Sequence, residues 1–437
     1  MKFTVKNLGL IDEAEVKLDG ITVMTGKNNV GKSTIGRMLY CVNNVLVKEN
    51  IEYIRRSGIK HAISSYLKKN EFIDLTLHID ENNLMNDLGK DENAMIDFLS
   101  GMFSAAYGNL KNDPFLSETG DNFLKMCEQN DDDEREQLAS RLKTEIECFL
   151  KSNRTNELVE MLLSLALKNN FGKKIGNVYN ESDETKVRLQ VEDEEFSIRL
   201  TMSDIASDLS KPFNLEEAIY IDSPQVAEKT ESTSIKQNDR NIFDSKQRIL
   251  NILALESDMT SWDEKGIEED FGRILITMNE FVKGSLQRKK LQRIQFEYEE
   301  DNHKFDLNNV STGVKTFAIL KKLITNGKLK RNGLLILDEP EIHLHPDWQL
   351  VFAEILVLLQ KQLNLKILIN THSVHFLMAL EEYSKGHKIK EKCNYYLVER
   401  KGNHSSCKDV TENLNEIYQH FANSLDRLEN LRWHDEE

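Results

Sequence analysis

A glycine-rich segment near the start of the chain has the residue types and the spacing that cradle phosphate groups. It runs from Gly26 to Ser33 and matches the pattern G-x-x-x-x-G-K-[ST] in full. Glycines allow the torsions that aim successive backbone N–H groups at phosphate oxygens, and the N-terminus of the following helix adds its positive dipole end. We predict that Lys32 reaches the β- and γ-phosphates of a nucleoside triphosphate and that the Ser33 hydroxyl ligates Mg²⁺. The residues expected to contact the nucleotide here are Gly26, Asn28, Asn29, Gly31, Lys32, Ser33 and Thr34.

Two carboxylates follow a run of aliphatic residues in the last third of the chain. The run Leu334 to Leu337 leads into Asp338, Glu339 and Pro340. A buried strand that ends this way places the carboxylates at the mouth of a parallel sheet, beside the phosphate loop. We expect Asp338 to orient the magnesium shell and Glu339 to orient or deprotonate the water that attacks the γ-phosphate. The competing interpretation is an ordinary acidic turn.

A histidine follows the next aliphatic run. Ile367 to Ile369 leads into Asn370, Thr371 and His372. An imidazole in this place can contact the γ-phosphate and report its presence, so His372 is a candidate catalytic residue together with Glu339. The alternative is a histidine that caps the strand through a local hydrogen bond.

A second anion-binding element is indicated by Ser311 and Gly313, which precede a strongly helical stretch from Val314 to Leu323. Backbone N–H groups at a helix N-terminus bind anions much as the phosphate loop does. Taken alone, the pattern also fits an ordinary helix N-cap.

The elements that must position these residues can be read from hydrophobic periodicity. We expect three short strands in the first 25 residues, a helix from about Ser33 to Leu46, and strands and helices alternating after about residue 308. Residues 50–170 read as helical, with the apolar face of one helix formed by Leu158, Met161, Leu162 and Leu165. The remaining expected strands are the hairpins 186–200 and 294–307, the strand 218–221 and the strand 394–398.

Composition excludes several classes of protein. The 437 residues are 39 % apolar and 30 % charged, with a net charge of −16, so indiscriminate binding to polyphosphate or acidic lipid is not expected. No apolar run approaches the ~18 residues of a spanning helix, and the N-terminus has no signal-peptide pattern. Five cysteines without C-x-x-C spacing indicate a reduced compartment. We therefore expect a cytoplasmic protein with no membrane contact.

The order of these motifs resembles that of ABC-type ATPases of the SMC-like branch. The stretch from Glu341 to Pro346, Glu-Ile-His-Leu-His-Pro, is similar in particular to the OLD (overcoming lysogenisation defect) family and to Septu- and retron-associated defence ATPases. The resemblance implies an α/β fold: an ABC-type P-loop NTPase head, residues 1–48 and 171–437, with an antiparallel β subdomain and a large helical insertion at 49–170. It places Glu341 to Pro346 in the D-loop of the dimer interface. A metal site at His343 and His345 is the alternative.

The same resemblance implies the cofactors ATP and Mg²⁺ and slow hydrolysis of ATP by a head-to-tail homodimer, or multiples of it. Ser311 and Gly313 would complete the nucleotide site of the partner protomer, so ATP would favour the closed dimer. The family also has a glutamine that joins the nucleotide to the helical lobe. Gln225 is the candidate, although it lies two residues later than expected, and a simple turn glutamine is the alternative.

The chain lacks the D-x-D after a strand that a Toprim nuclease would carry beyond His372. We therefore expect ATP binding to gate a separately encoded effector, a nuclease or toxin, in an antiphage defence complex. The alternative is an SMC-like DNA-binding clamp in repair or chromosome maintenance, which would contact DNA or RNA through basic patches. A transporter motor is disfavoured by the long insertion. The basic patches comprise Lys283, Arg288, Lys289, Lys290, Arg293, Lys321, Lys322, Lys328, Lys330 and Arg331.

Overall fold

The structure is a computed structural model that describes residues 1–51, 155–172, 176, 184–201, 205–209, 213–228, 243–255, 268–289 and 295–422. The chain divides into two compact units, one formed by Met1–Val47 with Glu160–Glu437 and the other by Lys48–Val159. Most of the predicted helical insertion, 49–170, lies outside the described residues. Its last helix, α7 (Thr155–Phe171), is described. The predicted apolar face of α7 is partly wrong: Leu158 and Leu162 are buried, but Met161 is 52 % exposed, and Leu163 and Ala166 are buried in its place.

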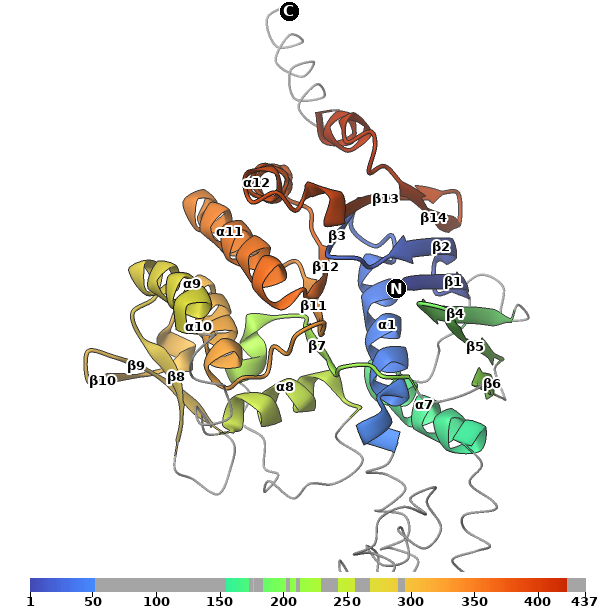
Figure 1. The fold of residues 1–437 in the computed structure, drawn as a ribbon, viewed down its shortest axis with the longest axis horizontal. Coiled ribbons are helices and arrows are strands. Elements are labelled where there is room, and N and C mark those ends of the chain that lie inside the picture. The colour runs from blue at the N-terminus through green and yellow to red at the C-terminus, as the bar shows by residue number, and fades with distance from the viewer. Residues whose placement is uncertain are drawn as a thin grey trace, which may run out of the picture. The chain divides into compact units, whose positions relative to one another are not determined.

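The first unit is built on a mixed sheet of 11 strands in the order β6-β5-β4-β1-β2-β14-β13-β3-β12-β11-β7 (Figure 1). From β13 to β7 neighbouring strands are parallel, whereas β2, β1, β4, β5 and β6 form an antiparallel meander. The bounds are β1 Lys2–Leu8, β2 Ile11–Lys17, β3 Ile21–Thr25, β4 Thr185–Val191, β5 Glu194–Leu200, β6 Ile205–Leu209, β7 Ala218–Ile221, β11 Leu334–Asp338, β12 Lys366–Asn370, β13 Cys393–Lys401 and β14 His404–Asp409. The predicted α/β class is confirmed.

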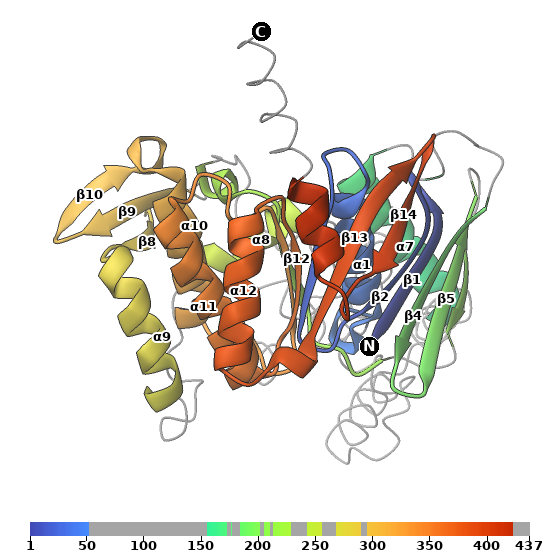
Figure 2. The ribbon, with the colours of Figure 1, turned by 90° about the horizontal axis from the view of Figure 1, so that it is seen from above.

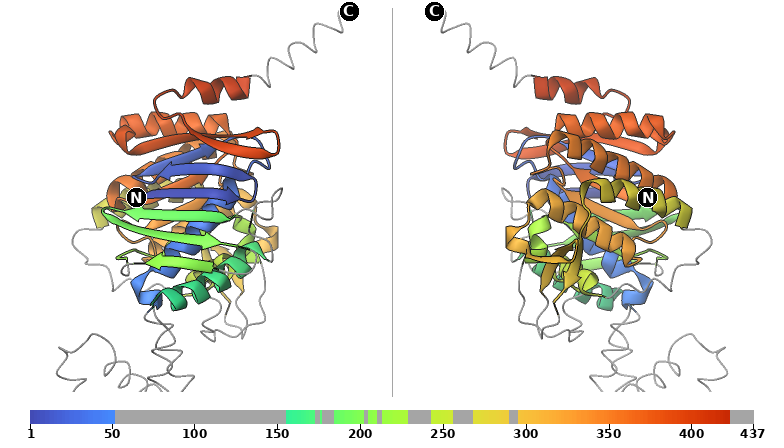
Figure 3. Two further views of the ribbon diagram at one scale, coloured as in Figure 1. Left: turned by 90° about the vertical axis from the view of Figure 1, so that its right-hand side faces the viewer. Right: turned by 90° about the vertical axis from the view of Figure 1, so that its left-hand side faces the viewer.

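Helices cover the parallel part of the sheet on both sides. Helix α1 (Lys32–Leu46) packs on β7, β11, β12 and β1, and it lies between the parallel strands and the antiparallel meander (Figures 1 and 2). The other face is covered by a group of helices that Figure 3 shows in orange and yellow, opposite the blue and green strands of the meander. This group comprises α8 (Ser245–Ala254), α9 (Glu268–Phe281), α10 (Thr312–Thr325), α11 (Pro346–Leu363) and α12 (Val374–Gly386). None of the helices in the described ranges is long and apolar enough to span a bilayer.

A smaller antiparallel sheet, β10-β9-β8, packs beside α10. Strands β9 (Phe296–Glu300) and β10 (His303–Asp306) form the predicted hairpin, while β8 (Ser285–Arg288) was not predicted. Strand β8 has four residues, of which only Leu286 is fully buried, so it is too short to show an alternating pattern. Strand β6 was missed for a similar reason, because most of its residues are only partly buried at the edge of the large sheet.

Candidate active site

The carboxyl ends of β3, β12 and β11 lie side by side and bring the predicted site residues together. Strands β3 and β12 pair in parallel so that Met24 is opposite Asn370, and β12 and β11 pair so that Asn370 is opposite Asp338. The phosphate loop continues from β3, and His372 and Glu339 continue from β12 and β11. Parallel strands end at the same edge of a sheet, and this edge is where α/β proteins bind their ligands.

The phosphate loop requires its glycines at defined positions. Gly26 has φ 142°, and a Cβ atom built on it would lie 2.1 Å from the carbonyl oxygen of Val398 on β13. Gly31 is the N-cap of α1, with φ 99°, and its Cβ would lie 2.7 Å from the side chain of Ile11. Asn29, also in the left-handed region with φ 59°, lies at the exposed tip of the loop with Asn28. The loop is therefore shaped by close packing against β2 and β13.

Lys32 points back into its own loop. Its Nζ atom donates hydrogen bonds to the carbonyl oxygens of Gly26, at 3.0 Å, and Lys27, at 2.9 Å. Burial lowers the pKa of Lys32 to about 8, although Glu339, Asp338 and Glu341 oppose the shift by attraction. An anionic ligand at this loop would favour the charged form of the amine.

The carboxylate of Asp338 is held by three donors from three different elements. Its Oδ1 accepts from the Ser33 hydroxyl and from the Asn370 amide, each at 2.9 Å, and its Oδ2 accepts from the Tyr220 hydroxyl at 3.0 Å. The Tyr220 hydroxyl in turn accepts from Nε of Arg37 on α1, at 3.3 Å. A carboxylate that accepts three hydrogen bonds from three different elements is fixed in orientation.

His372 lies between Lys32 and Glu339. Its Nε2 atom is 2.9 Å from Nζ of Lys32 and 2.7 Å from Oε1 of Glu339. Burial lowers the pKa of His372, and so does Lys32, while Glu339 acts in the opposite direction. A neutral imidazole that carries its proton on Nε2 donates to Glu339, whereas one that carries it on Nδ1 accepts from Lys32. Each neutral form of His372 can therefore satisfy one of its two neighbours at Nε2.

A comparison with known protein families identifies the family of this sequence. The family model of the AAA ATPase domain matches residues 1–377. This range includes the phosphate loop, the acidic strand end and His372. The chain belongs to the AAA ATPase domain family. The protein is therefore an AAA-family ATPase, which agrees with the nucleotide binding predicted from the phosphate loop.

Solved structures similar to this AAA-family ATPase include two SMC head domains. One is the SMC head domain from Thermotoga maritima, with 11 % identity, a TM-score of 0.39, and coverage of 94 % of this chain and 98 % of that chain. Another is the Smc head domain with an extended coiled coil, bound to the C-terminal domain of ScpA, from Pyrococcus furiosus. It has 10 % identity, a TM-score of 0.40, and coverage of 99 % and 98 %. No curated protein matches the chain significantly. The family assignment therefore depends on the sequence match.

Ser33 and Asp338 of this AAA-family ATPase fit a magnesium ion. They offer a hydroxyl and a carboxylate, hard oxygen donors of the kind that Mg²⁺ prefers, and the hydrogen bond between them places the two oxygens 2.9 Å apart. Magnesium in nucleotide sites takes one or two protein oxygens and completes its shell with phosphates and water. Ser33 and Asp338 would hold the ion, which when bound neutralises charge on the β- and γ-phosphates.

The described contacts of Ser311 and Gly313 are with α10 itself and with the segment after β11, not with the phosphate loop. Ser311 is exposed and caps α10, its hydroxyl accepting from the N–H of Val314 at 3.3 Å. Gly313 is buried, and a Cβ on it would lie 3.2 Å from Leu344 and 3.3 Å from the carbonyl oxygen of His343. The first turn of α10 thus packs against the segment predicted to be the D-loop. Both alternatives for Ser311, N-cap and anion site, are compatible with this geometry.

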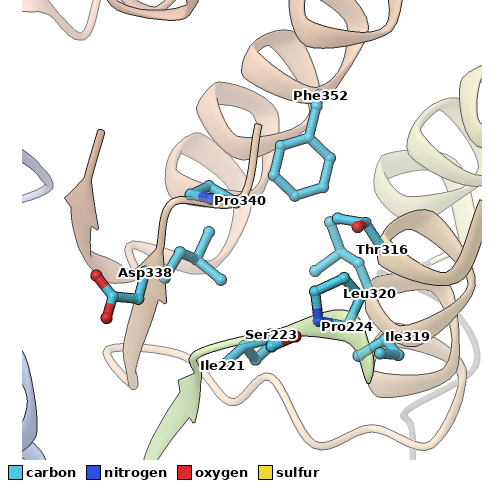
Figure 4. A pocket seen from close by; sticks show the side chains of 10 residues that line it. Ile221, Ser223, Pro224, Thr316, Ile319, Leu320, Asp338, Pro340 and Phe352 are labelled. Carbon is cyan, nitrogen blue, oxygen red and sulfur yellow. The ribbon is translucent and has the colours of Figure 1, made fainter. Parts of the chain in front are cut away.

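A small pocket separates α10 from the end of β11 (Figure 4). Its lining is mainly apolar and includes Pro224, Leu320 and Phe352, while the carboxylate of Asp338 points away from it. Gln225 follows Pro224 in the short helix η2 (Pro224–Glu228), with its side chain exposed to solvent. The described contacts of Gln225 thus fit the turn alternative, and its role as the lobe glutamine stays a prediction.

The two histidines after β11 take different positions. His345 is the N-cap of α11 and accepts from the N–H of Asp347 at 3.3 Å, and His343 is exposed, with φ 67°. In the part of the chain that the structure describes, no three His, Cys, Asp or Glu side chains are grouped so that they could hold a metal ion. The capping role of His345 gives this residue a structural function that the H-x-H pattern alone does not reveal.

Three residues of the site were not predicted as such. Tyr220 and Asn370 donate to Asp338, and Arg37 donates to Tyr220. Tyr220 lies in the buried strand β7, where the sequence predicts an aromatic residue to be part of the hydrophobic core. Its position opposite Ile336 of β11, two residues before Asp338, brings its hydroxyl to Asp338. Asn370 carried a signal, because a polar residue at the end of a buried strand is expected to reach a neighbouring strand end.

Proposed function

We propose that this AAA-family ATPase is an ABC-type ATPase that hydrolyses ATP slowly at a site shared between two protomers. The observation that supports the chemistry best is that Nζ of Lys32 and Oε1 of Glu339 both lie within 2.9 Å of Nε2 of His372. Lys32 would neutralise phosphate charge, and Glu339 would accept a proton from the attacking water. His372, which lies between Lys32 and Glu339, would also contact the γ-phosphate.

The backbone at Glu339 is consistent with this role. Glu339 has φ 50°, a left-handed conformation that costs a non-glycine residue about 1–3 kcal/mol. Its N–H donates to the carbonyl oxygen of Asn370 at 2.8 Å, which holds the strained turn in place. Its side chain is 30 % exposed, so water can reach the carboxylate. Strained residues of this kind are common at active sites.

The proposal of a shared site is supported by the contacts of the first turn of α10, which are with its own helix and the segment after β11 and not with the phosphate loop. Ser311 is exposed at an N-terminus whose N–H groups can receive an anion. In a head-to-tail homodimer, Ser311 and Gly313 of one protomer would face the nucleotide of the other. ATP would then stabilise the closed dimer, because it gives that state contacts that the open protomers lack.

We further propose that the closed dimer gates a separate nuclease or toxin in an antiphage defence complex, on the basis of the resemblance to OLD-like and Septu- and retron-associated ATPases. The DNA-clamp alternative is less well supported, because several of the basic residues proposed to contact nucleic acid already have partners within the protomer. Lys321 donates to the carbonyl oxygens of Val282, Lys283 and Gly284, and Lys289 and Lys330 pair with Asp306 and Glu216. Lys290 and Arg293 lie outside the described residues.

The proposal can be tested by measuring ATP turnover and molar mass on the same preparation. We expect Mg-ATP to convert the protomer into a dimer or a multiple of it, and the rate per protomer to rise with protein concentration. A protomer that stays single in saturating Mg-ATP and hydrolyses it at an undiminished rate would contradict the shared site. For the effector, the chain is co-purified with the product of its neighbouring gene, with and without ATP. Co-purification to the same extent with and without ATP would contradict the proposal that ATP gates the effector.

A further inference from the structure

Glu341 is a buried carboxylate that the mechanism proposed above does not use. It lies two residues after Glu339 and is 4 % exposed. Its Oε1 accepts hydrogen bonds from the main-chain N–H of His372, at 3.1 Å, and from the hydroxyl of Thr371, while its Oε2 is buried without a partner among the described residues. Burial raises the pKa of Glu341, although both hydrogen bonds act in the opposite direction. Burying such a group is costly unless hydrogen bonds compensate for the lost hydration.

The contacts of Glu341 join the loop after β11 to the loop after β12. A first connection, from the N–H of Glu339 to the carbonyl oxygen of Asn370, lies at the strand ends. Glu341 adds two more, one to Thr371 and one to the main chain of His372. The Thr371 hydroxyl also accepts from the N–H of Ser373, at 3.0 Å, where α12 is about to begin. The main chain on both sides of the His372 side chain is therefore fixed from the loop that carries Glu339.

We propose that Glu341 is a positioning residue that fixes the main chain of His372 and thereby keeps the imidazole between Lys32 and Glu339. The inference rests on the function proposed for this site. The hydrogen bonds of the Glu341 carboxylate go to Thr371 and to the His372 main chain, so it holds His372 in place. Its charge also favours the charged form of Lys32. The imidazole meets two partners at 2.7 and 2.9 Å, and a shift of about 1 Å in such a site can cost on the order of 100-fold in rate.

The kinetic test is a double-mutant cycle between Glu341→Ala and His372→Ala in the full chain. We expect Glu341→Ala to lower kcat by about 10- to 100-fold with little change in the KM for ATP, because ATP is bound mainly by the phosphate loop. In the His372→Ala background the same change should have no further effect. Glu341→Gln keeps an acceptor oxygen for Thr371 and His372 and should restore most of the rate. Losses that multiply, or a Gln variant as slow as the Ala variant, would overturn the positioning role.

A second readout needs no hydrolysis, so it separates this inference from the proposed function. Histidines labelled with ¹³C at Cε1 are observed by NMR in the full chain without nucleotide, and the His372 signal is assigned by its loss in His372→Gln. Glu341→Ala should shift that signal, and Glu341→Gln should return it close to its original position. Glu381→Ala is the matched control, since Glu381 also accepts from a hydroxyl, that of Tyr418, and pairs with Lys385 at 2.7 Å, on α12.

A His372 signal that does not move in Glu341→Ala would overturn the inference and leave the proposed ATPase function standing. Conversely, a wild-type chain that does not hydrolyse ATP would contradict the proposed function whatever the spectrum shows. Should Glu341→Ala fail to fold, Thr371→Val removes one donor of the same carboxylate, with Thr371→Ser as its control. The Val variant is then expected to move the His372 signal and the Ser variant to leave it in place.

Discussion

The Nζ atom of Lys32 lies 2.9 Å from Nε2 of His372, so the phosphate-loop lysine and the histidine after β12 meet directly. Burial lowers the pKa of both groups, and the nearby charge of Lys32 lowers the pKa of His372 further. Since a phosphate group at the loop would attract protons to Lys32, the arrangement makes nucleotide binding depend on pH.

We expect the affinity for ATP to fall above pH 8. The pKa of Lys32 in the free protein is about 8, and the unfolded value is 10.5. Between these values the folded protein holds fewer protons on Lys32 than the unfolded chain, so this group makes the free energy of unfolding rise with pH. ATP requires the charged amine, and its affinity should therefore fall by up to about tenfold per pH unit in that window.

Calorimetry in buffers of different ionisation enthalpy measures this effect. At pH 9, ATP binding to the wild type should take up a proton, and binding to Lys32→Arg should not, because arginine stays charged. Equal ATP affinities of the wild type at pH 7.5 and pH 9.5 would show that Lys32 is charged throughout.

Replacing Glu339 by Gln should separate ATP binding from hydrolysis. The amide keeps the size of the side chain but cannot accept the proton of water, so we expect kcat to fall by at least about 100-fold. ATP should remain bound and hold the chain in the closed oligomer, which light scattering would detect. Glu382→Gln, at an exposed position on α12, is the control. Turnover by Glu339→Gln equal to that of the wild type would remove the role given to Glu339.

Ser311→Arg tests the contribution of α10 to a neighbouring protomer. Because the described contacts of Ser311 do not include the phosphate loop of its own chain, we expect unchanged binding of a fluorescent ATP analogue and loss of both closure and hydrolysis. Asn308→Arg places the same charge at an exposed site just before α10 and should leave both intact. Normal hydrolysis by the Ser311 variant would argue for a site complete within one protomer.

Tyr220→Phe should weaken the response to magnesium. The change removes the hydroxyl that donates to Oδ2 of Asp338 and leaves Arg37 without its acceptor. Loss of a group that orients a metal ligand typically costs about 10- to 100-fold in metal affinity, so the Mg²⁺ concentration for half-maximal turnover should rise. Tyr298→Phe, in the small sheet, is the control, since its hydroxyl bonds Gly284 and Glu300. An unchanged magnesium requirement would mean that Tyr220 serves stability alone.

The local sequence determined most of the elements and the identity of the phosphate loop. Short aliphatic runs such as Ile21–Thr25 and Leu334–Asp338 predict buried strands, because consecutive apolar side chains point to opposite faces of a sheet and are all buried only where both faces are covered. The loop pattern carries its own chemistry, since its glycines and its lysine act within one segment of eight residues. Strands with only partial burial, such as β6 and β8, gave no comparable signal.

Only the tertiary structure decided which side chains share the site. Tyr220 reaches Asp338 directly, Arg37 reaches it through Tyr220, and Glu341 reaches His372. These partners are 31 to 301 positions apart in the sequence. No local pattern encodes these contacts, because they depend on the parallel register of β7, β11 and β12 and on the packing of α1 between the two parts of the sheet. Periodicity predicts that a residue is buried, whereas the register of its strand decides what it touches.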